Sequence, residues 1–236
     1  MIETALYLIP VTLGDTEISQ VLPSYNHDII VNIKHFIVEN IRSARRFLKK
    51  VEKSIDIDEL TFYELNRHTD RKFIGQYLEA MKNNCPIGII SEAGCPAIAD
   101  PGADVVAIAQ SRGYKVVPLV GPSSIIMSVM GSGFNGQSFA FNGYLPVDVP
   151  QRIKALKKLE NKVYNEDQTQ LFIETPYRNQ KMFDTIVSSL KPNTKLCVAA
   201  GITCKEEYIK TKTCAQWKKD KLPDFGKVPA IFLIGK

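Results

Sequence analysis

Short β-branched runs alternate with segments of helical apolar spacing through the first half of the chain, and this alternation limits the fold more than any other feature. Helices are predicted at residues 40–53, 73–81 and 105–109. Strands are predicted at residues 5–9, 29–33, 61–63, 87–90 and 115–118. Helices placed between strands cover a parallel sheet on both faces, so we expect a parallel α/β lobe.

The second half has a different pattern. Helices are predicted at 149–159 and 179–190, and strands at 138–142, 170–173, 196–199, 208–211 and 230–234. No helix separates 196–199 from 208–211, which favours an antiparallel pair and hence a mixed sheet. Since 236 residues exceed one domain of about 150 residues, we predict two α/β lobes, 1–118 and 119–236.

Composition excludes several classes of protein. The chain is 44% hydrophobic and 23% charged, as in ordinary globular proteins. No apolar run approaches about 18 residues and no basic segment precedes a leader-like stretch, so we expect a cytoplasmic protein with no membrane span. The five cysteines form no Cys-x-x-Cys pair and the three histidines are dispersed, so neither a metal site nor a catalytic cysteine is predicted.

Residues 40–53 predict an amphipathic helix with a cationic exterior. Its apolar positions recur at helical spacing. The remaining positions carry Arg42, Arg45, Arg46, Lys49, Lys50 and Lys53. This face is either merely solvated or binds phosphates, and the net charge of +5 permits an anionic partner.

The segment 89–102 joins a predicted strand to a predicted helix through a loop of small residues. Gly94 and Gly102 let the backbone approach a ligand or take a positive φ, while Pro96 and Pro101 stiffen the loop. Ligands of open parallel sheets bind at the carboxyl ends of the strands, so this loop is a candidate cofactor floor. The alternative is an ordinary turn between strand and helix.

A second segment of this kind spans 116–124. Gly121 ends the predicted strand, and Ser123 and Ser124 place hydroxyls at a helix start, where an anionic group is favoured. The first strand is followed by Pro10 rather than by a Gly-x-Gly-x-x-Gly turn, and no Gly-x₄-Gly-Lys-Ser/Thr motif occurs. Dinucleotide binding and P-loop chemistry are therefore disfavoured.

These segments resemble the tetrapyrrole methylase superfamily. The resemblance rests on Ser-Glu-Ala-Gly-Cys-Pro at 91–96, Asp-Pro-Gly at 100–102 and Pro-Leu-Val-Gly-Pro-Ser-Ser at 118–124. Phe-Asn-Gly-Tyr-Leu-Pro at 141–146 and Phe-Ile-Glu-Thr-Pro-Tyr-Arg at 172–178 look like the branch that contains the bacterial small-subunit ribosomal RNA cytidine 2′-O-methyltransferase. Similarity also covers 38–42 and 65–70, so it extends over nearly the whole chain.

The resemblance implies a homodimeric, metal-independent enzyme that binds S-adenosylmethionine in a cleft between its two lobes. Carried over by position, the cofactor-binding candidates are Pro10, Ala93, Gly94, Asp100, Pro101, Gly102, Gly121, Ser123, Ser124, Tyr144, Leu145 and Pro176. A weakly nucleophilic ribose hydroxyl benefits from a base or a cation, for which the candidates are Glu39, Arg42, His68 and Glu174. His68 could instead cap a turn, and Glu174 could instead pair with Arg178.

The sequence departs from that branch in several places. Residues 10–15 read Pro-Val-Thr-Leu-Gly-Asp where the family continues Pro-Ile-Gly-Asn, and 39–42 read Glu-Asn-Ile-Arg instead of Glu-Asp-Thr-Arg. Residues 200–204 read Ala-Gly-Ile-Thr-Cys instead of Arg-Glu-Leu-Thr-Lys, and the Lys-Gly-Glu before the last strand is replaced around 226–229. These changes suggest a divergent paralogue with an intact donor site and an altered acceptor site.

Three functions are compatible with these sequence features. The first is 2′-O-methylation of a ribose in small-subunit ribosomal RNA, favoured by the 172–178 motif and the basic helix. The second is methylation of a small molecule or another macromolecule, favoured by the lost charges. The third is a cofactor-binding scaffold without turnover, which binding without methyl transfer would reveal.

Overall fold

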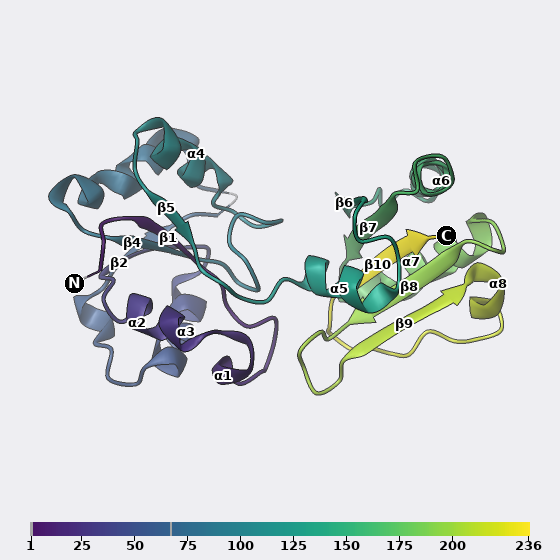
Figure 1. The fold of residues 1–236 in the computed structure, drawn as a ribbon, viewed down its shortest axis with the longest axis horizontal. Coiled ribbons are helices and arrows are strands. Elements are labelled where there is room, and N and C mark those ends of the chain that lie inside the picture. The colour runs from purple at the N-terminus through teal and green to yellow at the C-terminus, as the bar shows by residue number, and fades with distance from the viewer. Residues whose placement is uncertain (1, 67) are drawn as a thin grey trace. The chain divides into compact units, whose positions relative to one another are not determined.

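The computed structural model describes residues 2–66 and 68–236 and divides the chain into two compact units, Met1–Ser123 and Ser124–Lys236 (Figure 1). Each unit has its own sheet and its own hydrophobic core. No helix in the described part of the chain is long and apolar enough to cross a membrane.

The sheet of the first unit is parallel throughout its described strands, as the sequence predicts. Its strand order is β3-β2-β4-β1-β5. The strands are β1 (Leu6–Ile9), β2 (His35–Val38), β3 (Thr61–Glu64), β4 (Ile87–Ile90) and β5 (Val116–Pro118). The carboxyl ends of all five therefore meet at one edge.

Helices cover both faces of this sheet (Figure 1). On one face, α2 (Ser24–Ile30) and α3 (Ile41–Val51) share a core with Phe36 and Val38, after the short α1 (Ile18–Val21). On the other face, the 3₁₀ helix η2 (Arg71–Asn83) and α4 (Ala103–Ser111) pack on Ile37 and Ile89. The short η1 (Ile57–Glu59) precedes β3.

The strand predicted at 29–33 is wrong, because Ile29 and Ile30 belong to helix α2 and the second strand begins at His35. Ile29, Ile30 and Ile33 are all buried. A β-branched run that is buried against a sheet has the same composition as a strand, and so periodicity over five residues does not separate the two structures.

The second unit contains the predicted mixed sheet, in the order β6-β7-β10-β8-β9. Strands β6 and β7 are parallel, whereas β8 and β9 form the predicted antiparallel pair. The strands are β6 (Phe139–Tyr144), β7 (Thr169–Glu174), β8 (Lys195–Ala200), β9 (Tyr208–Thr213) and β10 (Ala230–Gly235). The helices are α5 (Ser124–Ser132), α6 (Val149–Glu166), η3 (Pro176–Arg178), α7 (Asn179–Ser189) and α8 (Cys214–Trp217).

Candidate functional site

Three segments join at the carboxyl edge of the parallel sheet, after β1, β4 and β5. The Val11 amide donates to the Gly94 carbonyl at 2.9 Å, and the Ser91 hydroxyl donates to the same carbonyl at 3.1 Å. The Cys95 thiol donates to the Pro122 carbonyl at 3.4 Å, and burial raises the pKa of this thiol. The two segments singled out from the sequence are thus held together at the edge where parallel sheets bind ligands.

Gly121 lies against the ring of Pro10. A Cβ at position 121 would lie 2.3 Å from Pro10 Cγ and 3.0 Å from Leu22 Cδ2. The packing between the ends of β1 and β5 therefore leaves no room for a side chain at position 121.

Replacing Gly121 by alanine is expected to lower the free energy of unfolding by about 2 kcal/mol, because the rigid Pro10 ring must shift. Urea denaturation followed by circular dichroism would measure this loss. Gly113→Ala is a control for an added Cβ, since no atom lies within 4 Å of its site, although its φ of +72° adds its own strain. A loss at Gly121 no larger than at Gly113 would contradict the packing role.

The loop after β4 holds unusual backbone conformations. Gly94 and Gly102 have φ values of +70° and +132°, which the sequence anticipates for glycine. Ala97 and Ala99 also have positive φ values, 64° and 61°, although alanine pays a steric cost there of about 1 kcal/mol. Strained non-glycine residues concentrate at functional sites, so this loop is part of the candidate site.

A cavity of about 850 Å³ opens between the carboxyl ends of β2, β3 and β4. Five carboxylate residues line it: Glu39, Glu64, Glu92, Asp100 and Asp104. Among its other lining residues are Asn40, His68, Pro101 and Gly102. Its volume lies within the range of small-molecule pockets, roughly 300–1,000 Å³, and its charge favours a cationic ligand.

The carboxylates of this cavity, referred to below as the acidic cavity, perturb one another. Burial, together with Glu39 and Glu92, raises the pKa of Asp100 to about 6. Burial, and to a lesser extent Glu92, raises the pKa of Glu39. Burial is the larger cause of both shifts, and the mutual repulsion of the carboxylates adds to it. Arg71 also lines the cavity and lies 3.7 Å from Asp104, so the carboxylates still outnumber the cations there, and a bound cation would favour their ionised forms.

The cavity brings together five of the predicted residues, Glu39, His68, Asp100, Pro101 and Gly102. The His68 amide donates to the Asn66 side chain at 2.8 Å, so its backbone takes part in a turn. The other predicted residues of the first unit, Pro10, Arg42, Ala93, Gly94, Gly121 and Ser123, do not line this cavity.

In the second unit, predicted residues gather at the carboxyl ends of β6 and β7, which are neighbouring parallel strands. Tyr144 ends β6 and is 58% exposed, whereas Leu145 is buried. Pro176 begins η3 just after β7. Ser124 is the first residue of α5.

Glu174 is buried, with 1% of its side chain exposed, and its Oε1 accepts several hydrogen bonds. Arg178 donates from Nε at 2.8 Å and forms an ion pair through Nη2 at 2.6 Å, and the Thr175 amide donates at 2.7 Å. Because this oxygen is already occupied by donors from Arg178 and Thr175, the geometry favours the structural alternative, in which Glu174 pairs with Arg178.

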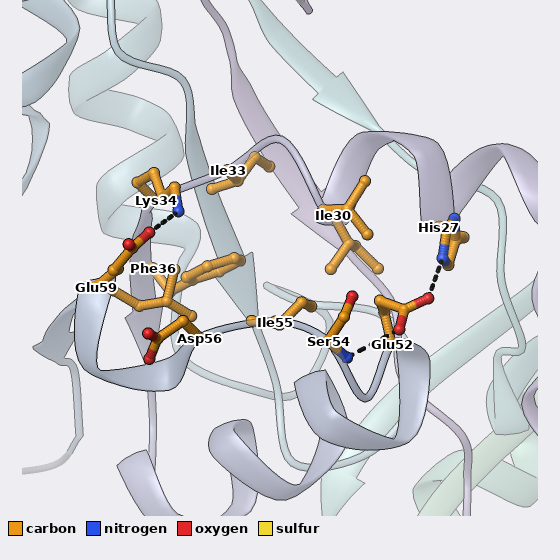
Figure 2. Close-up of a pocket in the computed structure, with 12 residues that line it drawn as sticks. His27, Ile30, Ile33, Lys34, Phe36, Glu52, Ser54, Ile55, Asp56 and Glu59 are labelled. Carbon is orange, nitrogen blue, oxygen red and sulfur yellow. Dashed lines mark hydrogen bonds and ion pairs between the residues drawn. The ribbon is translucent and has the colours of Figure 1, made fainter.

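A second cavity, of about 420 Å³, lies at the opposite edge of the parallel sheet (Figure 2). Its polar side chains satisfy one another: Lys34 bonds Glu59 at 2.6 Å, and His27 bonds Glu52 at 3.3 Å. This cavity lies near Lys34, before β2 begins, whereas ligands of such sheets bind at the carboxyl edge. The acidic cavity is therefore the better candidate.

Glu64 and Glu92 line the acidic cavity but are absent from the sequence-based candidates. Glu64 ends β3 and Glu92 follows β4 by two residues. The signal that could have found them is their position at the ends of adjacent parallel strands. Placing the second strand at 29–33 hid this signal, because Glu39 then no longer follows a strand.

Sequence comparisons identify bacterial relatives that match most of the chain. No family model matches. "Ribosomal RNA small subunit methyltransferase I" of Buchnera aphidicola subsp. Schizaphis graminum is 27% identical over 234 residues, covering 97% of this chain and 77% of the relative. The protein of the same name from Vibrio cholerae is 27% identical over 212 residues, covering 89% and 69%.

Solved structures share the fold at lower identity. A diphthine synthase has a TM-score of 0.65 at 15% identity and covers 98% of this chain and 90% of its own. The methyltransferase CobJ gives 0.63 at 12%, covering 99% and 94%. Uroporphyrin-III C-methyltransferase from Thermus thermophilus, complexed with S-adenosylhomocysteine, gives 0.56 at 13%, covering 98% and 97%. Together these comparisons confirm the predicted resemblance to the tetrapyrrole methylase superfamily.

Proposed function

We propose that this protein is an S-adenosylmethionine-dependent methyltransferase that methylates a ribose 2′-oxygen in small-subunit ribosomal RNA. The acidic cavity at the carboxyl edge of the parallel sheet carries the proposal, because its chemistry fits a cationic methyl donor. The two relatives named above act on small-subunit ribosomal RNA, as their names state. The ribose hydroxyl as acceptor comes from the resemblance of residues 172–178.

The residues around the cavity fit the donor by charge. S-adenosylmethionine supplies an electrophilic methyl group on a positively charged sulfonium. Asp100, whose pKa is raised to about 6 by burial and then by Glu39 and Glu92, would attract that positive charge in its ionised form, and Pro101 and Gly102 extend the same wall. The hydrogen-bonded floor of Gly94 and Val11 keeps the neighbouring backbone in place.

The acceptor hydroxyl needs a group that takes its proton. Glu39 meets this requirement better than the other catalytic candidates, because it lines the cavity and its pKa is raised. His68 lines the same cavity, Arg42 is exposed on α3, and Glu174 is bound to Arg178. We therefore assign Glu39 as the proton acceptor, with positioning of the two reactants supplying much of the remaining rate.

A different acceptor is the second candidate function. Residues 200–204 lack the three charges of the ribosomal branch. They form the end of β8 and a turn in which Gly201 and Thr203 have positive φ values of 59° and 69°. Charge lost from an acceptor site changes which molecule is held there. A retired scaffold is the third candidate, and it would bind the donor without turnover.

Methyl transfer to RNA tests the proposal. Purified protein would be incubated with S-adenosylmethionine and small-subunit ribosomal RNA, free and in subunits, and the digested nucleosides analysed by mass spectrometry. We expect one 2′-O-methylated nucleoside, and its loss in Glu39→Gln with donor binding retained. Transfer only to free small molecules would establish the second function, and donor binding without any transfer would establish the third.

We also propose a homodimer in the cytoplasm, following the resemblance and the ribosomal substrate of the relatives. Ile126 and Met130 lie one helical turn apart on α5 and are 47% and 76% exposed, and neighbouring exposed apolar side chains suit a protein contact. Light scattering after gel filtration should give twice the chain mass of 26.4 kDa. A mass equal to that of one chain across the concentrations used for activity would contradict the dimer.

A further inference from the structure

We propose that the outer face of α3 is the surface that holds the phosphate backbone of the acceptor RNA next to the acidic cavity. This inference rests on the proposed function and assigns its RNA contact to one helix. The outer face consists of Arg42, Arg45, Arg46, Lys49 and Lys50, all exposed.

The cations of α3 lie on one side of the helix. At 3.6 residues per turn, the five positions fall within a sector of roughly 140°. The opposite side packs on the core, with Ala44 3% and Leu48 0% exposed. The result is a continuous positive face on a rigid element, rather than a set of scattered surface charges.

Most of these cations have no carboxylate partner within the described ranges, 2–66 and 68–236. Lys50 lies 3.8 Å from Asp15, whereas Arg42, Arg45, Arg46 and Lys49 form no ion pair with any described residue. Arg45 lies over the Phe62 ring at 5.5 Å, which leaves its charge unneutralised. By contrast, Lys34, the residue before β2, is paired with Glu59. Unpaired cations on one face are what a polyanion requires.

The helix starts at the cavity. Glu39 and Asn40 both line the cavity, and the Asn40 side chain caps α3 by accepting from the Arg42 and Ser43 amides. From this cap the 11 residues of α3 extend for about 16 Å, several phosphate spacings along a strand. A backbone held on this face would place one ribose near the carboxylates.

The acidic cavity and the outer face of α3 carry opposite charges and would attract different ligands. Five carboxylate residues in the cavity attract a cationic donor but repel phosphates. RNA that brings a ribose to that cavity therefore needs an attractive surface close by, and the face of α3 supplies it. A lipid surface fits less well, because the apolar side of α3 is already buried in the core and has no side chains to insert.

Charge reversal on α3 tests this inference. The double variant Arg46→Glu/Lys49→Glu would be compared with Lys154→Glu/Lys158→Glu, which makes the same charge change at exposed positions of α6. Binding of each protein to small-subunit ribosomal RNA and to phosphatidylserine vesicles would be measured over a range of salt concentrations. Calorimetry with S-adenosylmethionine would verify the donor site in each variant.

We expect the α3 variant to bind RNA at least about tenfold more weakly than the wild type. The dependence of log affinity on log salt should become less steep by about 1.5, because two phosphate contacts are lost. The α6 variant should lose less than about threefold, and both should keep donor affinity. Equal losses in the two variants, or vesicle binding that depends on α3 while RNA binding does not, would overturn the inference. If the α3 variant methylated RNA as efficiently as the wild type, the inference would be overturned while the proposed function would stand.

Discussion

Replacing Arg178 by methionine is expected to destabilise the second unit by about 3 kcal/mol, the cost of leaving a buried carboxylate without its cation. Glu174 is 1% exposed and receives two contacts from the Arg178 guanidinium, at 2.8 Å and 2.6 Å. Methionine keeps most of the packing volume but offers no donor. Urea denaturation of the wild type and the variant would measure the difference.

A double-mutant cycle separates the ion pair from the packing. Glu174→Leu combined with Arg178→Met should recover much of the loss, because no buried charge remains. Lys212→Met is the matched control: its ion pair with Asp220 is partly exposed, with side chains 29% and 42% accessible, and should contribute less than about 1 kcal/mol. A loss at Arg178 as small as that at Lys212 would show that the pair is not structural.

The second large effect concerns Asp100 and pH. The pKa of Asp100 is raised to about 6 in the folded protein by burial and by Glu39 and Glu92. A cationic donor favours the ionised carboxylate, so binding must compete with a proton below that pH. We expect affinity for S-adenosylmethionine to fall about tenfold between pH 7 and pH 5. Asp100→Asn should bind more weakly at pH 7 and lose most of this pH dependence.

The raised pKa of Asp100 also predicts how the stability of the free protein changes with pH. Because the folded state holds the Asp100 proton more tightly than the unfolded chain, its contribution to stability is present below about pH 4 and is lost as the pH rises through 6. Asp100→Asn should therefore stabilise the free protein at pH 7, by about 1 kcal/mol after allowance for solvent screening. Asp104→Asn is the control, because this carboxylate lines the same cavity but is exposed, with its Oδ2 3.7 Å from Arg71 Nε. Equal pH profiles for the two variants would contradict the assignment to Asp100.

The sequence predicts the fold well where a local pattern decides the structure. The strand at 87–90 and the helix after Gly102 follow from apolar runs and from glycine, and both are confirmed. The run at 29–33 fails because a buried helix and a buried strand have the same β-branched composition there. That choice depends on which face of the sheet the segment covers, and a short window does not contain this information.

The candidate site, like the fold, could be predicted from the sequence only where a local pattern decides it. The loop with Gly94 and Asp100 is recognisable from its small residues, but the grouping of Glu64 and Glu92 with Glu39 depends on strand order. Gly121 appears in the sequence as a point of ligand approach, whereas its Cβ position is taken by Pro10. Valine at Gly94 or Gly121 would consequently test packing more than cofactor contact, so Asp100 is the better probe of the donor site.

Calorimetric titration with S-adenosylmethionine and S-adenosylhomocysteine at pH 7.5, for the wild type and for Asp100→Asn, measures the occupancy of the donor site itself. We expect micromolar binding to the wild type. We also expect a loss of about tenfold in Asp100→Asn for S-adenosylmethionine, and a smaller loss for S-adenosylhomocysteine, which lacks the sulfonium charge. Folded wild-type protein that binds neither molecule would contradict the methyltransferase assignment, and equal losses for both would contradict the role of the acidic cavity.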